Sequence, residues 1–304
     1  MSIFVADGDS QHGGGMFSSE KDCIAMVVRP TEHARGPWDP RALHGGSIAA
    51  LIAAAFERLE PGSALPIARL GFEFLRPIPL APLRLTTRIV RPGRRVQELA
   101  AELTALPAEP GGANAGADAE QVVCRASALR VQPVAAEVGA AAALPHAPDA
   151  SDASDADART AETLPPPEAG KLVRFSLNDS EESSFAASAM EMRWLDDPRA
   201  LGPARVWMRL RHPLLAGEQL TALTRLAATA DFGNGVGASL PFERFVFINA
   251  DLTIHLQRQP RGEWIGVNAR TLLHSGGTGL AESVLHDVHG PVGRAFQTLV
   301  VEPR

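Results

Sequence analysis

The stretch that decides the fold runs from Leu43 to Leu59 and reads LHGGSIAALIAAAFERL, and residues 69–80, RLGFEFLRPIPL, follow it. Alanine and leucine dominate the first segment and no proline interrupts it, which predicts a helix. This helix is apolar nearly all round, so it must be buried on most sides. The second segment ends in proline-bounded turns and is typical of a strand. A long apolar helix beside antiparallel strands is expected to be wrapped by them, which makes the unit α+β.

The rest of the first half supplies further strands to this unit. Residues 83–90, 97–106 and 121–131 are rich in β-branched or alternating residues and are separated by proline and glycine turns. Residues 23–28, CIAMVV, fit one more strand before the helix. Residues 107–120, PAEPGGANAGADAE, lie between two of these strands and are expected to form an enlarged hairpin loop.

The second half of the chain repeats the same order of elements. Residues 204–210 correspond to the first strand, and residues 220–240 are helical at least at their start. The later strands correspond to residues 245–258, 264–273, 279–288 and 293–301. The predicted architecture is therefore two tandem copies of one unit.

Matching residues at a nearly constant offset indicate an internal duplication. Arg76 and Arg258 lie 182 positions apart, as do Arg88 and Arg270. The offset is 181 just before residues 107–120 and falls to 169 after them. The change is confined to the one loop that looks enlarged, as expected for two repeats that differ by a loop insertion.

A segment of different composition separates the two copies. Residues 133–170 are rich in alanine, aspartate, proline and serine, with almost no large apolar side chain. Such a segment buries too little surface to offset its ordering entropy. We therefore expect an N-terminal unit over residues 1–132, a disordered linker over 133–170, and a C-terminal unit over 171–304.

Composition and charge argue against nucleic-acid binding and indicate where the protein is located. The net charge of -6 argues against a dedicated nucleic-acid binder, which would usually carry a basic face. The two cysteines, Cys23 and Cys124, predict a reducing compartment, so we expect a cytoplasmic protein. The first fifteen residues lack a basic start followed by an apolar run, and residues 48–56 are too short to span a bilayer, so neither a signal peptide nor membrane insertion is expected.

Five motifs resemble those of one known family. They are Pro37–Pro40, Leu43–Gly46 and Phe74–Pro77 in the first half, and Asn249–Leu256 and Arg294–Gln297 in the second. In these motifs the chain resembles the type II acyl-CoA thioesterases (TesB-like) of the thioesterase-like superfamily. The resemblance implies a double hotdog, in which each unit is an antiparallel sheet wrapped around a long central helix. It also implies hydrolysis of a fatty acyl-CoA or related thioester to the free acid and CoA, no cofactor, and a homo-oligomer.

The resemblance also implies a catalytic centre in the second unit. There an aspartate, a threonine or serine, and a glutamine position the hydrolytic water. Asp251 stands seven places before Arg258, as in the family pattern, and Gln297 takes the glutamine position. The hydroxyl is expected from Thr271, with Ser275 as the alternative.

The residues themselves give two readings of this centre. By strand alternation Asp251 shares a polar face with Thr253 and His255, which lines either a cleft or solvent. Gln297 interrupts an apolar strand, and a buried amide needs partners. The first repeat has Arg69 and Ala128 at the positions of Asp251 and Gln297, so one active centre per chain is expected.

A second group of candidate residues lies at the start of the first helix. His44, Gly45 and Gly46 precede it, and the free N–H groups of a helix N-terminus suit a thioester oxygen or a phosphate of CoA. The alternative is a tight turn with no chemical role. Asp231, in the equivalent part of the second helix, is a candidate cleft residue, and the nearby glycines of 233–237 disfavour a regular helix there.

Other chemistries find less support in the sequence. His286 and His289 lack zinc-ligand spacing, so no metal site is expected, and no GxSxG elbow of a serine hydrolase occurs. A non-catalytic module that binds acyl-CoA or lipid is the main alternative to the enzyme. A hotdog dehydratase is a third possibility, but the helical His and acidic pair that it needs is not evident.

Overall fold

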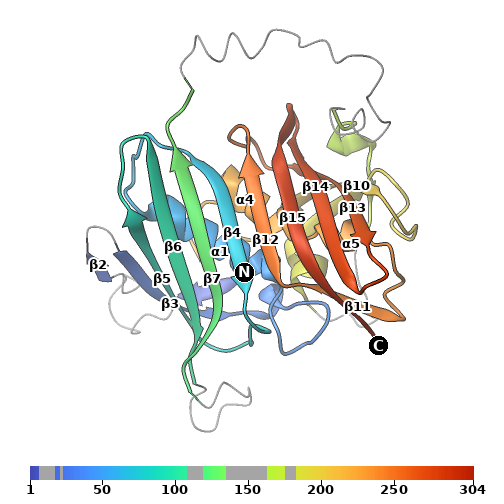
Figure 1. Cartoon of the computed structure of the whole chain (residues 1–304), viewed down its shortest axis with the longest axis horizontal. Helices are drawn as coiled ribbons and strands as arrows, with labels where there is room; N and C mark the ends of the chain where they lie inside the picture. Colours follow the sequence, from blue (N-terminus) through green and yellow to red (C-terminus); the bar gives the residue numbers. More distant parts are fainter. Residues whose placement is uncertain (7–17, 21–22, 108–118, 135–162, 175–182) are drawn as a thin grey trace.

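The computed structural model describes residues 1–6, 18–20, 23–107, 119–134, 163–174 and 183–304, which form one antiparallel sheet with helices on one face (Figure 1). The strand order is β1-β3-β5-β6-β7-β4-β12-β15-β14-β13-β10-β9-β8, with β2 beside β3 and β11 beside β15. Strands of each sequence half stay together in the sheet. The expected pair of hotdog units is therefore confirmed, and their sheets are joined side by side.

The N-terminal half consists of one long helix, a short 3-10 turn and strands that follow the predicted order. The helix is α1 (Gly45–Arg58) and the turn is η1 (Glu32–Ala34). The strands are β1 (Phe4–Ala6), β2 (Ser18–Glu20), β3 (Cys23–Pro30), β4 (Ile67–Phe74), β5 (Leu83–Arg91), β6 (Val96–Ala105) and β7 (Gln121–Val131). The predicted strand at residues 23–28 is thus β3, and β6 and β7 pair as the expected hairpin.

The C-terminal half repeats this plan with additions at its start. Its helical elements are η2 (Pro167–Ala169), η3 (Phe185–Ala189), α4 (Ala222–Ala230) and α5 (Gly233–Val236). Its strands are β8 (Lys171–Leu172), β9 (Met190–Trp194), β10 (Ala204–Leu210), β11 (Phe245–Asn249), β12 (Asp251–Leu256), β13 (Ile265–Leu273), β14 (Thr278–Asp287) and β15 (Gly290–Pro303). The predicted strand 204–210 is β10, whereas β8 and β9 were not predicted.

The two halves meet where β4 pairs with β12. Leu70 lies opposite Ile254 in this pair, and both are fully buried toward the helices. Phe72 and Leu252 form the next inward pair in the same register. The inward-facing apolar side chains of β4 and β12 therefore lie side by side across the junction, so the two sheets share one core.

The helices α1 and α4 pack against each other in opposite directions beneath this sheet (Figure 1). His44, just before α1, contacts Asp231, just after α4. At the other end, Glu57 near the end of α1 accepts a hydrogen bond from the Thr221 hydroxyl at the start of α4, at 2.7 Å. The start of each helix therefore lies at the end of the other.

The second helix is shorter than the long central helix expected for each unit. It ends at Ala230, and after a turn at Asp231 and Phe232 a single further turn, α5, follows. The physical reason is the glycine-rich run, because Gly233 lies so close to β14 and β15 that a Cβ there would be 2.5 Å from Ser283 Oγ. Close approach to the sheet takes precedence over helix continuity at this point.

The expected linker is shorter than residues 133–170. Leu164 is only 6% exposed, and Pro165 O accepts a hydrogen bond from Trp207 Nε1 at 2.7 Å. The expectation that this segment buries almost nothing is therefore wrong for residues 163–170, because Leu164 fills the space that Gly266 leaves beside Trp207. Residues 135–162 lie outside the described residues, as do 108–118 of the loop at 107–120.

Two expectations from the sequence concern the surroundings of the protein, namely no membrane insertion and self-association. No helix among the described residues is long and apolar enough to cross a membrane. The self-association expected from the sequence stays a prediction.

We predict that Leu164→Ala destabilises the fold although its sequence neighbourhood resembles a tether. Removing a buried leucine side chain typically costs about 2–5 kcal/mol of unfolding free energy. Leu201→Ala is the matched control, because Leu201 is 53% exposed and surface changes stay within about 0.5 kcal/mol. Urea unfolding measures both, and equal midpoints for the two variants would contradict the packing of this segment.

Candidate active site

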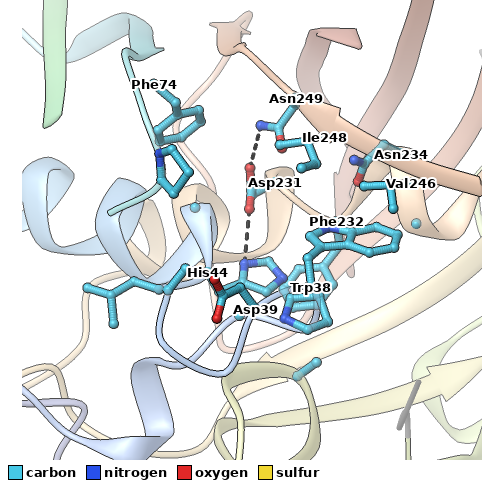
Figure 2. A pocket seen from close by; sticks show the side chains of 18 of the residues that line it. Trp38, Asp39, His44, Phe74, Asp231, Phe232, Asn234, Val246, Ile248 and Asn249 are labelled. Carbon is cyan, nitrogen blue, oxygen red and sulfur yellow. Dashed lines mark hydrogen bonds and ion pairs between the residues drawn. The ribbon is translucent and has the colours of Figure 1, made fainter. Parts of the chain in front are cut away.

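A large cavity lies between the two halves, beside the start of α1 and the end of α4 (Figure 2). Its volume is about 560 Å³. Most of its wall is apolar or aromatic, and three of its polar side chains, His44, Asp231 and Asn249, contact one another. The wall includes Trp38, His44, Gly45, Phe74 and Arg76 from the N-terminal half, and Met192, Trp194, Met208, Asp231, Phe232, Asn234, Phe242, Ile248 and Asn249 from the C-terminal half.

The carboxylate of Asp231 is the centre of the polar cluster. Asp231 follows α4 directly and is only 4% exposed. Its Oδ2 lies 3.0 Å from His44 Nδ1, and its Oδ1 accepts a hydrogen bond from Asn249 Nδ2 at 2.9 Å (Figure 2). A buried carboxylate therefore has polar partners from both halves of the chain, as a buried charge requires.

A β-bulge at Ala250 turns Asn249 toward this carboxylate. Asn249 pairs with Leu299, but Thr253 pairs with Phe296, so the β11–β12 segment has one residue more than β15. A bulge of one residue reverses the alternation of side chains along the strand. As a result Asn249 points toward the helices and Asp251, two positions later, points away from them.

Gln297 positions the turn that carries Asp231. Its Nε2 donates to the backbone oxygen of Asp231 at 3.0 Å, and its Oε1 accepts the backbone N–H of Asn234 at 2.9 Å. Gln297 is 1% exposed and does not line the cavity. Both ends of its amide thus hold the backbone between α4 and α5, which fixes the direction of the Asp231 side chain.

The start of α1 lies against the same carboxylate. A Cβ at Gly45 would be 2.8 Å from both carboxylate oxygens of Asp231, so only glycine leaves room for them. The positive end of the helix dipole stabilises an anion placed there. Among the described residues, the Gly45 N–H donates to no protein acceptor, since the helix cannot supply one to its first residue.

Comparisons with known proteins bear on this architecture directly. A family model described as the acyl-CoA thioesterase N-terminal domain matches residues 34–131, and one described as the acyl-CoA thioesterase C-terminal domain matches residues 154–301. Together they cover most of the chain. The chain belongs to the acyl-CoA thioesterase family. As a member of this family it is a thioester hydrolase.

Solved structures agree with the fold of this thioesterase. A proposed thioesterase from Novosphingobium aromaticivorans superposes with a TM-score of 0.64 at 17% identity, covering 93% of this chain and 97% of its own. A hot dog fold protein from Alicyclobacillus acidocaldarius gives 0.62 at 16%, covering 95% and 96%. An acyl-CoA thioesterase II from Mycobacterium marinum gives 0.58 at 15%, covering 94% and 93%. No curated protein matches the sequence.

The catalytic triad expected from the sequence is not assembled in the thioesterase. Asp251 lies on the outer face of the sheet, where its Oδ1 accepts the backbone N–H of Thr298 at 2.6 Å. The buried Thr271 hydroxyl has no hydrogen-bond partner among the described residues, and Ser275 is exposed in the turn between β13 and β14. Neither these three residues nor Gln297 lines the cavity. Asp251, Thr271 and Gln297 therefore do not meet at this cavity, and the catalytic roles expected for them stay a prediction.

The residues expected at the helix start are brought together more closely. His44, Gly45 and Asp231 all line the cavity, whereas Gly46 lies behind them against α4. Asn249 was missed, because strand alternation without the bulge directs attention to Asp251. One feature of the sequence could have identified Asn249 as a candidate site residue: it is the polar residue within the otherwise apolar run 245–250.

Cys124 does not serve the thioesterase as a nucleophile. Burial raises the pKa of the Cys124 thiol to about 12, and the nearby Glu73 carboxylate adds to the shift. The thiol therefore stays protonated at neutral pH, whereas thiol chemistry needs the thiolate. Among the described residues, no group of three or more His, Cys, Asp or Glu side chains is arranged to hold a metal ion.

We predict that Gly46→Ala destabilises the protein, because the new Cβ would lie 2.5 Å from the backbone oxygen of Ala228 and α1 and α4 would have to separate. A shift of this kind resembles overpacking, which typically costs about 1–3 kcal/mol. Gly235→Ala is the control, since a Cβ there meets no atom within 4 Å. Thermal unfolding compares the two, and a melting temperature for Gly46→Ala equal to that of Gly235→Ala would contradict the close helix packing.

Proposed function

We propose that this thioesterase hydrolyses a fatty acyl-CoA to the free acid and CoA in the cavity between its two halves. The observation that carries the proposal is the buried Asp231 carboxylate at the wall of an apolar cavity, bonded by His44 and Asn249. Apolar walls with a few convergent polar groups are the usual form of a small-molecule site.

The apolar part of the cavity suits the acyl chain. Trp38, Phe74 and Phe242 form part of its wall near the surface, and Met192 and Met208 contribute from the C-terminal sheet. Trp38 contacts Phe242 and Phe247 at ring-centroid distances of 5.7 and 5.4 Å, so these aromatic side chains form one cluster. Burial of the acyl chain against such a wall contributes about 0.8 kcal/mol per CH₂ group.

The first turn of α1 is suited to the thioester carbonyl. The Gly45 N–H has no acceptor among the described protein groups, and Gly45 lines the cavity. A carbonyl oxygen bound there would gain negative charge in the transition state, which a helix N-terminus stabilises. The same position lies beside Asp231, so the carbonyl carbon would be close to the base.

The cluster around Asp231 supports activation of a water molecule. The carboxylate and the His44 ring are the groups there that can accept a proton, and the Asn249 amide holds the carboxylate in place. General-base help of this kind is typically worth about a hundred- to ten-thousand-fold in rate. Attack of the water on the carbonyl carbon then releases the acid and the thiol of CoA.

Cationic side chains near the cavity support a substrate with phosphate groups. Arg76 lines the cavity just past the end of β4. The guanidinium of Arg304 lies 5.7 Å from the centre of the Trp38 ring, over a second part of the wall. Guanidinium groups suit phosphates because of their charge and planar donors.

We predict that Asp231→Asn lowers kcat for acyl-CoA hydrolysis by about a hundred- to ten-thousand-fold, because the amide removes the negative charge on which the acid–base cluster depends. Asp251→Asn is the matched control, and it should keep at least about half of the activity because its amide oxygen can still accept the Thr298 N–H. Release of free thiol from acyl-CoAs of increasing chain length measures both variants.

The opposite ranking, with Asp251→Asn inactive and Asp231→Asn active, would move the centre to the outer face of the sheet. If the unmutated chain binds acyl-CoA but releases no thiol at any chain length, the non-catalytic binding module replaces the enzyme.

A further inference from the structure

We propose that His44 and Asp231 form one acid–base pair, in which Nε2 of His44 takes the proton from the hydrolytic water. The inference rests on the proposed thioester hydrolysis and goes beyond it, because it assigns the moving proton to a residue of the N-terminal half. The second half alone would then lack a base. The two tandem units would have to act together in each turnover.

The distance between the two side chains requires a proton between them. His44 Nδ1 and Asp231 Oδ2 lie 3.0 Å apart, and both side chains are at most one-tenth exposed. A bare carboxylate oxygen and a nitrogen lone pair would repel each other at this distance without water to separate them. One of the two atoms therefore carries a hydrogen and donates it to the other.

The surroundings of Asp231 favour the hydrogen on His44. Oδ1 of the carboxylate accepts from Asn249 Nδ2, and the whole group lies against Gly45 at the start of α1. A donor and the positive end of a helix both stabilise the ionised carboxylate. The hydrogen then resides on Nδ1, and Nε2 is the ring nitrogen with the lone pair.

A competing contact makes this assignment testable. The backbone N–H of Gly46 also lies 3.0 Å from Nδ1, in the geometry of a helix cap. The Gly46 N–H is the donor in this contact, so if Nδ1 acts only as its acceptor, Nδ1 carries the lone pair, Asp231 has to be protonated, and His44 only caps the helix. The two arrangements place the imidazole hydrogen on different nitrogens.

The position of the ring suits a role in the cavity. His44 lines the cavity, and its ring stacks on Phe232 at 4.5 Å with Phe185 on a second side at 5.1 Å. Nδ1 makes both polar contacts recorded for the ring, which leaves Nε2 for a water or substrate. The aromatic neighbours limit rotation of the ring, so Nε2 keeps one direction.

Other charged groups of the cavity do not compete for His44. Asp39 lines the same cavity, but Arg41 holds its carboxylate at 3.0 Å. Arg76 also lines the cavity, just past the end of β4, and no contact between it and His44 is found in the part of the chain that the structure describes. Among the described residues, Asp231 is thus the charged group in contact with the ring.

The reaction balances without any further reactant. Nε2 takes a proton from water as the water oxygen bonds to the thioester carbon. The carbon–sulfur bond then breaks, and the same proton passes from Nε2 to the leaving sulfur. Asp231 keeps its hydrogen bond to Nδ1–H throughout and stabilises the imidazolium that forms in between.

The first test reads the tautomer in the unmutated protein. Nitrogen-15 NMR of the full chain labelled at histidine should show His44 with Nδ1 protonated and Nε2 unprotonated at pH 8. The signal is assigned by its absence from His44→Gln or by its shift in Asp231→Asn. Protonation of Nε2 instead of Nδ1 would overturn the proposal, and this reading does not depend on any catalytic activity.

The second test is kinetic. His44→Gln should lower kcat by about a hundred- to ten-thousand-fold, because the amide cannot take the proton from water. The double variant His44→Gln/Asp231→Asn should be at most a few-fold slower than the slower single variant, because residues that act as a unit are not additive. His33→Gln is the control, since this buried histidine bonds Ser188 away from the cavity and should keep its activity.

Two outcomes separate the proposal from the function on which it rests. If His44→Gln folds and stays within about threefold of the unmutated kcat while Asp231→Asn is inactive, Asp231 is the base and His44 is only a helix cap. If the unmutated protein releases no thiol from any acyl-CoA, the proposed function fails, while the NMR measurement still decides whether the pair exists.

Discussion

The antiparallel packing of α1 against α4 is the constraint on which the rest of the structure depends. It places the start of α1 at the end of α4, so that His44 and Gly45 meet Asp231 across the boundary between the halves. Neither helix could lie so close without the glycine at position 46, which faces the backbone of α4. The sheet joins the two halves where β4 pairs with β12.

The same packing creates a second helix end, which differs chemically from the first. There Glu57 accepts hydrogen bonds from the Thr221 and Thr224 hydroxyls at the start of α4. Burial raises the pKa of Glu57, although these two hydroxyls oppose the shift. The counterpart of Gln297 in the first repeat is Ala128, so no amide holds the backbone there as Gln297 does in the second. The duplication thus produces two places where the start of one helix meets the end of the other. Among the described residues, the large cavity lies at the one formed by His44 and Asp231.

Much of this organisation was predictable from the sequence, because periodicity and the repeat reflect burial directly. The order of elements follows from the internal repeat. The break in the second helix follows from glycines such as Gly233 and Gly235. The proposed site was predicted only in part: His44, Gly45 and Asp231 were named, but Asp251 was preferred as the base. Alternation reverses at the Ala250 bulge, and no glycine or proline between Phe245 and Leu256 indicates in the sequence where that bulge lies.

A crystal structure with an unreactive acyl-CoA analogue, in which CH₂ replaces the thioester sulfur, tests the central claim most directly. The account predicts the acyl chain in the cavity between the halves, with the keto oxygen within about 3.2 Å of the Gly45 N–H. It also predicts the keto carbon next to Asp231 and His44. An analogue bound with its keto group near Asp251 or Thr271, or on the outer face of the sheet, would contradict the account.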